Sequence, residues 1–159
     1  MRPKLANAFL AGFVGTLLMS LVLYYVNPLV AGRPLDLAAT LADVLGGSWI
    51  SGYIAHYLLG TLIFPAVYAL FAYRWLVGSP AVRGATWGTL LWLLSQMVVM
   101  PLIGGGVFST QAGGFVAALG SLLGHLVYGL ALGSLGGGPR DATGRQALSQ
   151  TGTQVRQAG

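Results

Sequence analysis

The chain contains two histidines, His56 and His125, and they are the residues best suited to hold a cofactor. Each opens the pattern His-x-x-x-Gly, which ends at Gly60 in the first case and at Gly129 in the second. Neutral imidazole is a good axial ligand for haem iron, and helical bundles hold cofactors between facing helices. If the two rings face each other, they predict haem b as the cofactor, with its iron ligated by both histidines.

A porphyrin also needs a flat and uncrowded surface beside each of its ligands. Small residues on the helices that carry the histidines could provide that surface: Gly52, Gly60, Gly124 and Gly129. These glycines are therefore predicted to bind the cofactor. Most glycines in an apolar helix serve only to let neighbouring helices approach, and this interpretation remains open for them.

Two other interpretations of the histidines remain open. A metal site could combine the pair with Met97, Met100 or Gln96, although it would lack carboxylates and cysteines. Alternatively, each histidine only makes a hydrogen bond across the bundle, because buried polar groups normally find a partner. The candidate partners, which would also form the second shell of a haem site, are Thr16, Thr89 and Gln96.

The histidines become an equivalent pair because the sequence repeats. Residues 15–32 (GTLLMSLVLYYVNPLVAG) align without a gap with residues 88–105 (GTLLWLLSQMVVMPLIGG), at an offset of 73. The identical pairs are Gly15/Gly88, Thr16/Thr89, Leu17/Leu90, Leu18/Leu91, Leu21/Leu94, Val26/Val99, Pro28/Pro101, Leu29/Leu102 and Gly32/Gly105. Apolar composition alone would not place Gly-Thr and proline in register. The chain is therefore predicted to be a duplicated unit, with one histidine after each copy.

The elements that position the histidines must be membrane helices. The chain is 55% hydrophobic and 7% charged, whereas soluble domains are about 25% charged. Its mean hydropathy is +0.75. Four apolar segments approach or exceed the roughly 20 residues that span a bilayer: 6–29, 49–76, 84–103 and 115–135. We expect an all-α, integral membrane four-helix bundle made of two tandem two-helix repeats.

The connections between these segments are short. Residues 1–136 form the membrane domain, in which Leu37–Leu45 is predicted to be a short interfacial helix capped by Asp36. The breaker cluster within residues 77–82 makes the second and third helices antiparallel neighbours. Residues 137–159 are polar and rich in Gly, Gln and Thr, and we expect them to form a disordered cytoplasmic tail.

The basic residues predict the orientation of the chain. With a cytoplasmic N-terminus, one side of the membrane carries Arg2, Lys4, Arg74, Arg83, Arg140, Arg145 and Arg156, and only Arg33 lies on the other. This distribution follows the positive-inside rule and places both termini in the cytoplasm. The same rule accounts for the net charge of +5, so the excess of basic residues gives no support to nucleic-acid binding.

Several chemistries are not expected. The chain has no cysteine, which excludes disulfides, cysteine-ligated iron–sulfur clusters and covalent c-type haem attachment. The acidic residues Asp36, Asp43 and Asp141 all fall in loops or in the tail, so they can form neither a Ser/His/Asp triad nor a carboxylate pair. An enzyme is therefore the least favoured class.

The arrangement of glycines and single polar residues carries a family resemblance. The segments AGFVGTLLMS, HYLLGTLIFPAVY, WGTLLWLLSQMVVMPLIGGGVFS and SLLGHLVYG resemble small uncharacterised four-helix bacterial inner-membrane proteins of the YagU type. The resemblance covers roughly residues 5–135 and excludes the tail. It implies a location in the bacterial inner membrane and no established activity.

Two functional classes follow from these observations. The first is a non-catalytic helical module, or an accessory subunit of a membrane complex, that holds haem b between His56 and His125. The alternative is a small-solute permease or channel acting as an oligomer, since parallel repeats occur in transporters. Its partners are expected to be the lipid bilayer, together with other membrane helices or further copies of the chain.

Overall fold

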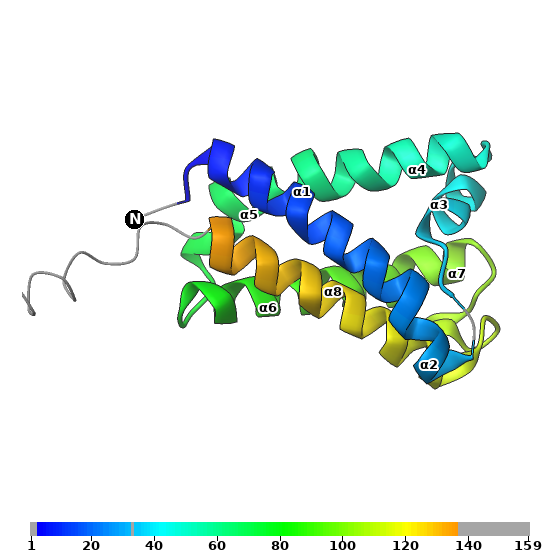
Figure 1. The fold of residues 1–159 in the computed structure, drawn as a ribbon. Helices are drawn as coiled ribbons and strands as arrows, with labels where there is room; N and C mark the ends of the chain where they lie inside the picture. The colour runs from blue at the N-terminus through cyan, green and yellow to red at the C-terminus, as the bar shows by residue number, and fades with distance from the viewer. Residues whose placement is uncertain (1–2, 33, 137–159) are drawn as a thin grey trace, which may run out of the picture.

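The computed structural model describes residues 3–32 and 34–136, and these residues form an all-α bundle (Figure 1). Four helical segments are long and apolar enough to cross a membrane: Leu5–Ala31, Trp49–Leu70, Pro80–Leu102 and Gly114–Gly136. The fold class expected from the sequence is confirmed, and the protein is a multi-pass membrane protein. The expected tail, residues 137–159, lies outside the described residues.

The first three spans are each interrupted by a π-helical turn. The first consists of α1 (Leu5–Leu21), η1 (Val22–Val26) and α2 (Asn27–Ala31). The second consists of α4 (Trp49–Leu58), η2 (Leu59–Ile63) and α5 (Phe64–Leu70), and the third of α6 (Pro80–Leu94), η4 (Ser95–Val99) and α7 (Met100–Leu102). The fourth span is the uninterrupted helix α8 (Gly114–Gly136).

Proline explains where these π turns fall. Pro28, Pro65 and Pro101 each stand two residues after the end of a π turn. A proline inside a helix donates no backbone hydrogen bond, and its ring clashes with the carbonyl four residues earlier. The wider π turn moves that carbonyl away, so each helix continues past its proline. No proline occurs in α8, which is regular throughout.

Helix α8 lies at the centre of the bundle and packs against both α1 and α6. On the α6 side the two backbones touch. A Cβ atom added at Gly129 would collide with the carbonyl oxygen of Gly84, and one added at Gly88 would collide with the carbonyl oxygen of His125. Because lipid supplies no hydrophobic drive between helices, such close contacts between small residues hold the spans together.

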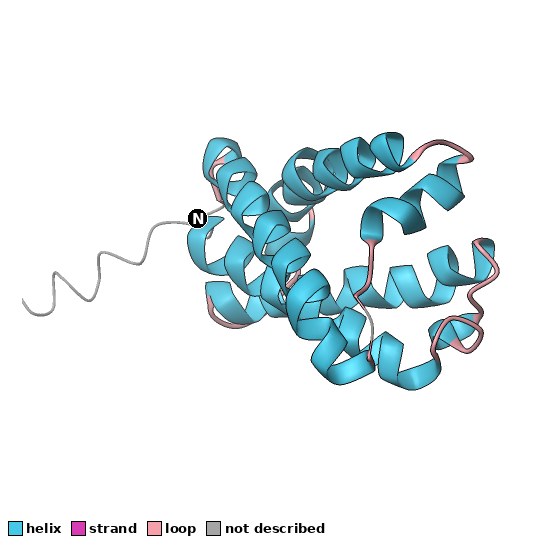
Figure 2. Cartoon of the chain, turned by 45° about the vertical axis from the view of Figure 1, so that its right-hand side comes forward, coloured by secondary structure: helices cyan, strands magenta, loops and turns pink. Residues whose placement is uncertain are grey.

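The second span packs against α1 through η2 and α5, while α4 diverges from the rest of the bundle (Figure 2). At the close contact, a Cβ on Gly12 would collide with the ring of Pro65 and the carbonyl oxygen of Gly60. The short helix α3 (Leu37–Leu45) packs against α4, where Gly52 lies directly against the backbone of Ala38. The span is therefore close to the bundle at one end and separated from it at the other.

The boundaries of two spans differ by four or more residues from those expected. The second span ends at Leu70 and not at residue 76, because the chain tightens into the 3₁₀ turn η3 (Ala72–Arg74). The third begins at Pro80 and not at residue 84. Ser79 caps this helix with its hydroxyl oxygen, which accepts from the amide of Val82 at 3.4 Å, and proline suits the first helical position.

The charged side chains that the structure describes are divided between the two ends of the bundle. Among the described residues, the basic side chains Lys4, Arg74 and Arg83 lie at the end where α1 starts and α8 finishes. We call this the basic end. Asp36 and Asp43 lie at the opposite end with α3, which we call the α3 end. The spans expose many apolar side chains between these ends, and these contact the lipid bilayer.

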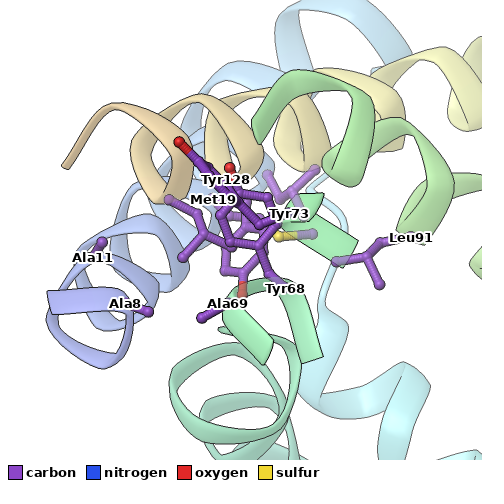
Figure 3. Packing of buried hydrophobic residues seen from close by; sticks show 10 residues of the cluster. Ala8, Ala11, Met19, Tyr68, Ala69, Tyr73, Leu91 and Tyr128 are labelled. Atoms are coloured by element: carbon purple, nitrogen blue, oxygen red, sulfur yellow. The ribbon is translucent and has the colours of Figure 1, made fainter. Parts of the chain in front are cut away.

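A tightly packed core occupies the half of the bundle near the basic end (Figure 3). The Tyr68 ring lies 5.6 Å from that of Tyr73 and 6.1 Å from that of Trp87, measured between centroids. Ala8 and Leu132 are completely buried in the same cluster. The bundle is therefore filled with aromatic side chains on this side, whereas the other half is more open.

The contact between α6 and α8 generates a prediction. Gly129→Val is expected to destabilise the protein by about 1–3 kcal/mol, the usual range for overpacking, because the new side chain must push α6 away. Thermal unfolding in detergent, followed by circular dichroism, measures the effect. Ser134→Val, at an exposed position of the same helix, is the matched control and should unfold like the wild type. Equal destabilisation by both variants would contradict the close contact.

Candidate functional site

Both histidines line one cavity of about 130 Å³ inside the bundle. His56 reaches it from α4 and His125 from α8, and every other span contributes to its wall. The lining residues are Thr16, Met19, Leu37, Thr40, Leu41, His56, Leu59, Gly60, Phe64, Leu91, Leu94, Ser95, Val99, His125 and Tyr128. The cavity is mostly apolar, and the two imidazoles are its only ionisable groups apart from the Tyr128 phenol.

The backbone of α8 fixes the orientation of His125. Its ring Nδ1 lies 2.8 Å from the carbonyl oxygen of Ser121, one helical turn earlier. A carbonyl only accepts hydrogen bonds, so Nδ1 must carry the proton and donate. In the neutral ring the lone pair then belongs to Nε2, on the opposite edge from the helix backbone. His125 is 8% exposed and presents this edge away from its own helix.

A serine on α1 fixes the orientation of His56. The Ser20 hydroxyl donates to the carbonyl oxygen of Thr16 at 2.8 Å, and Nε2 of His56 lies 3.2 Å from the same hydroxyl oxygen. With the serine proton given to the Thr16 carbonyl, His56 pairs with the hydroxyl oxygen by donating through Nε2. The lone pair of neutral His56 therefore lies on Nδ1. Each histidine has one nitrogen held by the bundle and one available to a ligand.

A second cavity of about 380 Å³ lies towards the α3 end, and His56 lines it as well. Its other polar side chains include Ser20, Tyr53, Tyr57 and Asp36. Asp36 is held in place because its Oδ2 accepts from the indole Nε1 of Trp49 at 2.8 Å. His56 thus separates an outer, acidic cavity from the inner cavity that contains His125.

Helix α3 covers both cavities. Leu37 lines both, whereas Thr40 and Leu41 line only the inner one. Asp36 starts the helix as its N-cap, since Oδ1 accepts from the amide of Ala39 at 3.0 Å. The same carboxylate therefore caps α3 and binds Trp49 at the start of α4. The short helix expected from the sequence is present at Leu37–Leu45 and forms part of the site.

The four glycines predicted to bind a cofactor have different positions. Gly60 lines the inner cavity and contacts the hydroxyl of Thr16. Gly52 lies against α3, Gly124 against the side chain of Leu23, and Gly129 against α6. Only Gly60 therefore borders the space between the histidines, and the other three bring helices together.

The three predicted polar partners of the histidines also lie in different parts of the structure. Thr16 lines the inner cavity, but its hydroxyl donates to the carbonyl oxygen of Gly12 at 2.8 Å. Thr89 donates to Ala85 of its own helix at 3.0 Å and does not line the cavity. Gln96 is buried, and its Oε1 accepts from the Ser109 hydroxyl at 2.8 Å. The structure brings only Thr16 of these three to the histidines.

The methionines considered as metal ligands lie elsewhere. Met97 is 57% exposed, and Met100 lies against Gly105 near the end of the third span; neither lines the inner cavity. The cavity instead contains Met19, which the sequence analysis did not single out. Its spacing three residues after Thr16, on the same helical face, is the signal that could have identified it.

Tyr128 is a further residue that the sequence analysis left among the packing aromatics. Its hydroxyl donates to the carbonyl oxygen of Gly60 at 2.8 Å, which links the fourth span to the second beside the cavity. The π turn at η2 precedes Pro65, so its carbonyl oxygens are less completely used inside the helix. The phenol thus ties together the two segments that carry the histidines.

Within residues 3–32 and 34–136, no group of three or more His, Cys, Asp or Glu side chains comes together. The site is therefore limited to two histidines and the neutral groups around them.

The chain belongs to a family of unknown function, DUF6789, which matches residues 2–140. This membership does not link the chain to the YagU type, so that resemblance stays a prediction. Comparison with curated proteins and with solved structures finds no match.

The hydrogen bonds of the histidines can be tested directly. In protein labelled with ¹⁵N-histidine, NMR at a pH where both rings are neutral should find His125 protonated at Nδ1 and His56 protonated at Nε2. Ser20→Ala should alter the signals of His56 and leave those of His125 unchanged. The opposite tautomer at His125 would mean that the Ser121 carbonyl does not orient its ring.

The dual role of Asp36 generates a second prediction for this region. Asp36→Ala removes the cap of α3 and the acceptor of Trp49, and loss of a cap costs about 0.5–2 kcal/mol. Amide hydrogen exchange across residues 37–45 should become faster. Asp43→Ala, on the exposed face of the same helix, should leave exchange unchanged. Unaltered exchange in Asp36→Ala would show that other contacts hold α3.

Proposed function

We propose that this protein is a non-catalytic membrane module that binds a metal-bearing group between His56 and His125. One observation carries the proposal: the two histidines, from different spans, line the same buried cavity. Polar side chains inside a membrane bundle usually mark a site, because leaving them there without a role is costly. Each ring also has one nitrogen held by a neighbour and one lone pair free.

The hydrogen bonds support ligation over simple packing. Histidines that bind metals usually donate their second N–H to a carbonyl or to another acceptor, which sets the tautomer and the direction of the ring. His125 donates to the Ser121 carbonyl, and His56 donates to the Ser20 hydroxyl. In the alternative hypothesis each histidine is satisfied by a bond across the bundle, but only His56 makes one, to Ser20, while His125 bonds to its own helix.

Haem b is one candidate for the bound group, and the pair of imidazoles favours it. The inner cavity is about 130 Å³, whereas pockets for drug-sized ligands are roughly 300–1,000 Å³. A porphyrin would therefore need the spans around the cavity to move apart. A metal ion or a small complex fits the cavity without that movement.

The shape of the bundle favours a binding site over a passage. Met19, Leu91 and Tyr128 line the inner cavity and also belong to the buried core near the basic end. The core therefore forms the floor of the cavity. A permease or channel would have to open this packed aromatic region, whereas a binding module can keep it closed. Docking of the module to other membrane helices, as an accessory subunit, is the corresponding biological role.

We extend the proposal to the origin of the histidine pair by gene duplication. The π turns Val22–Val26 and Ser95–Val99 are separated by the same offset of 73 as the repeated sequence, and each precedes the shared proline. This agreement supports two copies of one helical unit. The two histidines lie 69 residues apart, so an ancestral pair of identical units would have brought one histidine from each copy to the cavity with a shift of four residues between them.

The test is uptake of three probes by the full-length protein in detergent: haem followed by absorption spectroscopy, and Zn(II) and Cu(I) followed by elemental analysis after desalting. The wild type should retain at least one probe, and both His56→Ala and His125→Ala should lose it. Thr89→Ala is the control and should behave as the wild type, because Thr89 does not line the cavity.

Two results would contradict the proposal. The wild type could retain none of the three probes, which would leave the histidines without a metal-bearing ligand. Alternatively, both histidine variants could retain a probe as well as the wild type does, which would place its binding elsewhere. Melting temperatures of all variants establish that a loss of binding does not come from unfolding.

A further inference from the structure

We propose that the inner cavity is a copper(I) site in which the Met19 thioether is the third ligand beside His56 and His125. This inference rests on the proposed function and specifies its ligand. All three residues line the same cavity, and they come from three different spans: α1, α4 and α8. Donors on separate helices can surround an ion from different sides.

Met19 is positioned to be a ligand. It is 6% exposed, so its sulfur faces the interior of the bundle. Figure 3 shows its side chain extending from α1 in the direction of Leu91 on α6, and Leu91 also lines the cavity. The neighbouring residue, Ser20, binds His56. The same turn of α1 therefore supplies one proposed ligand and orients another.

The chemistry of the donors selects the metal. Thioether sulfur is a soft ligand that favours Cu(I), and imidazole binds copper well, while carboxylates suit hard ions such as Mg²⁺ and Ca²⁺. All three donors are neutral. The four spans contain no acidic residue, and Asp36 lines only the outer cavity, so no carboxylate lines the inner cavity itself.

The charge of the ion matters because desolvation is expensive in the membrane. The Born cost of moving an ion into a low-dielectric medium increases with the square of its charge. By this relation, the desolvation free energy of a divalent ion held by neutral ligands is about four times that of a monovalent one. The absence of acidic residues from the spans thus disfavours Zn(II) and favours Cu(I).

The outer cavity supplies an entry route. Asp36 lines it near the α3 end, and its negative charge raises the local concentration of cations. His56 lines both cavities, so an ion that reaches the outer one meets the first proposed ligand directly. From there the inner cavity leads to Met19 and His125. The aromatic core closes the opposite side.

The experiment is an anaerobic Cu(I) titration of the full-length protein in detergent against a chromogenic Cu(I) chelator. The wild type should bind one Cu(I). Met19→Leu should weaken binding by at least about tenfold, since even loss of an outer-shell group costs 10–100-fold. Met97→Leu is the matched control, because Met97 is 57% exposed and outside the cavity, and it should bind like the wild type.

X-ray absorption at the copper edge tests the ligand itself. A sulfur neighbour should be present in the wild type and in Met97→Leu, and absent from Met19→Leu. Leucine for methionine nearly conserves side-chain volume, so the variant should fold. Wild-type affinity in Met19→Leu, or a copper site without sulfur in the wild type, would overturn the inference.

The outcomes separate this inference from the proposed function. If Met19→Leu has no effect while His56→Ala and His125→Ala abolish binding of Cu(I), Zn(II) or haem, the copper–thioether site is wrong and the two-histidine module stands. If the wild type binds none of these probes, both proposals fail.

Discussion

This structure depends on one constraint, which is how closely neighbouring helices can approach each other. Between α6 and α8 the glycines at positions 84, 88 and 129 leave backbone against backbone, and Gly12 does the same between α1 and the second span. Towards the α3 end this close contact is lost for α4, because α3 packs against it through Gly52. The divergence leaves the space in which the histidines lie. Tight packing at one end and a cavity at the other thus have a common cause.

Polar groups inside that space are held by the backbone and by short side chains. The Ser20 and Thr16 hydroxyls both return to carbonyl oxygens one turn earlier on α1, and the Tyr128 phenol donates to the Gly60 carbonyl. Such bonds satisfy the donors without a charged partner, and charged groups are costly to bury in an apolar bundle. These bonds leave one lone pair on each of the two imidazoles for a ligand.

Hydropathy and residue type were sufficient for the fold class, because long apolar segments have few alternatives in a membrane. The same energetic argument identified both histidines. The sequence did not indicate that α3 would separate α4 from the bundle, since this depends on a contact between Gly52 and Ala38. The role of Gly52 against α3 therefore could not be predicted, and neither could the contacts of Gly124 with Leu23 and of Gly129 with α6 or the position of Met19 in the cavity, because each depends on which helices are neighbours. The Met19 sulfur gains significance only when two other helices place histidines around the same cavity.

The unequal ends of the bundle give the site a direction. Among the described residues, the acidic side chains lie at the α3 end and the basic ones at the other, and Asp36 lines the outer cavity. The aromatic core reinforces this asymmetry because it fills the path beyond Tyr128. A neutral pair of imidazoles placed behind an acidic entrance and before a closed floor is suited to retain an ion that enters and leaves by the same side. The lining of the cavity and the packed core beneath it therefore support the proposed binding role over the alternative of a channel.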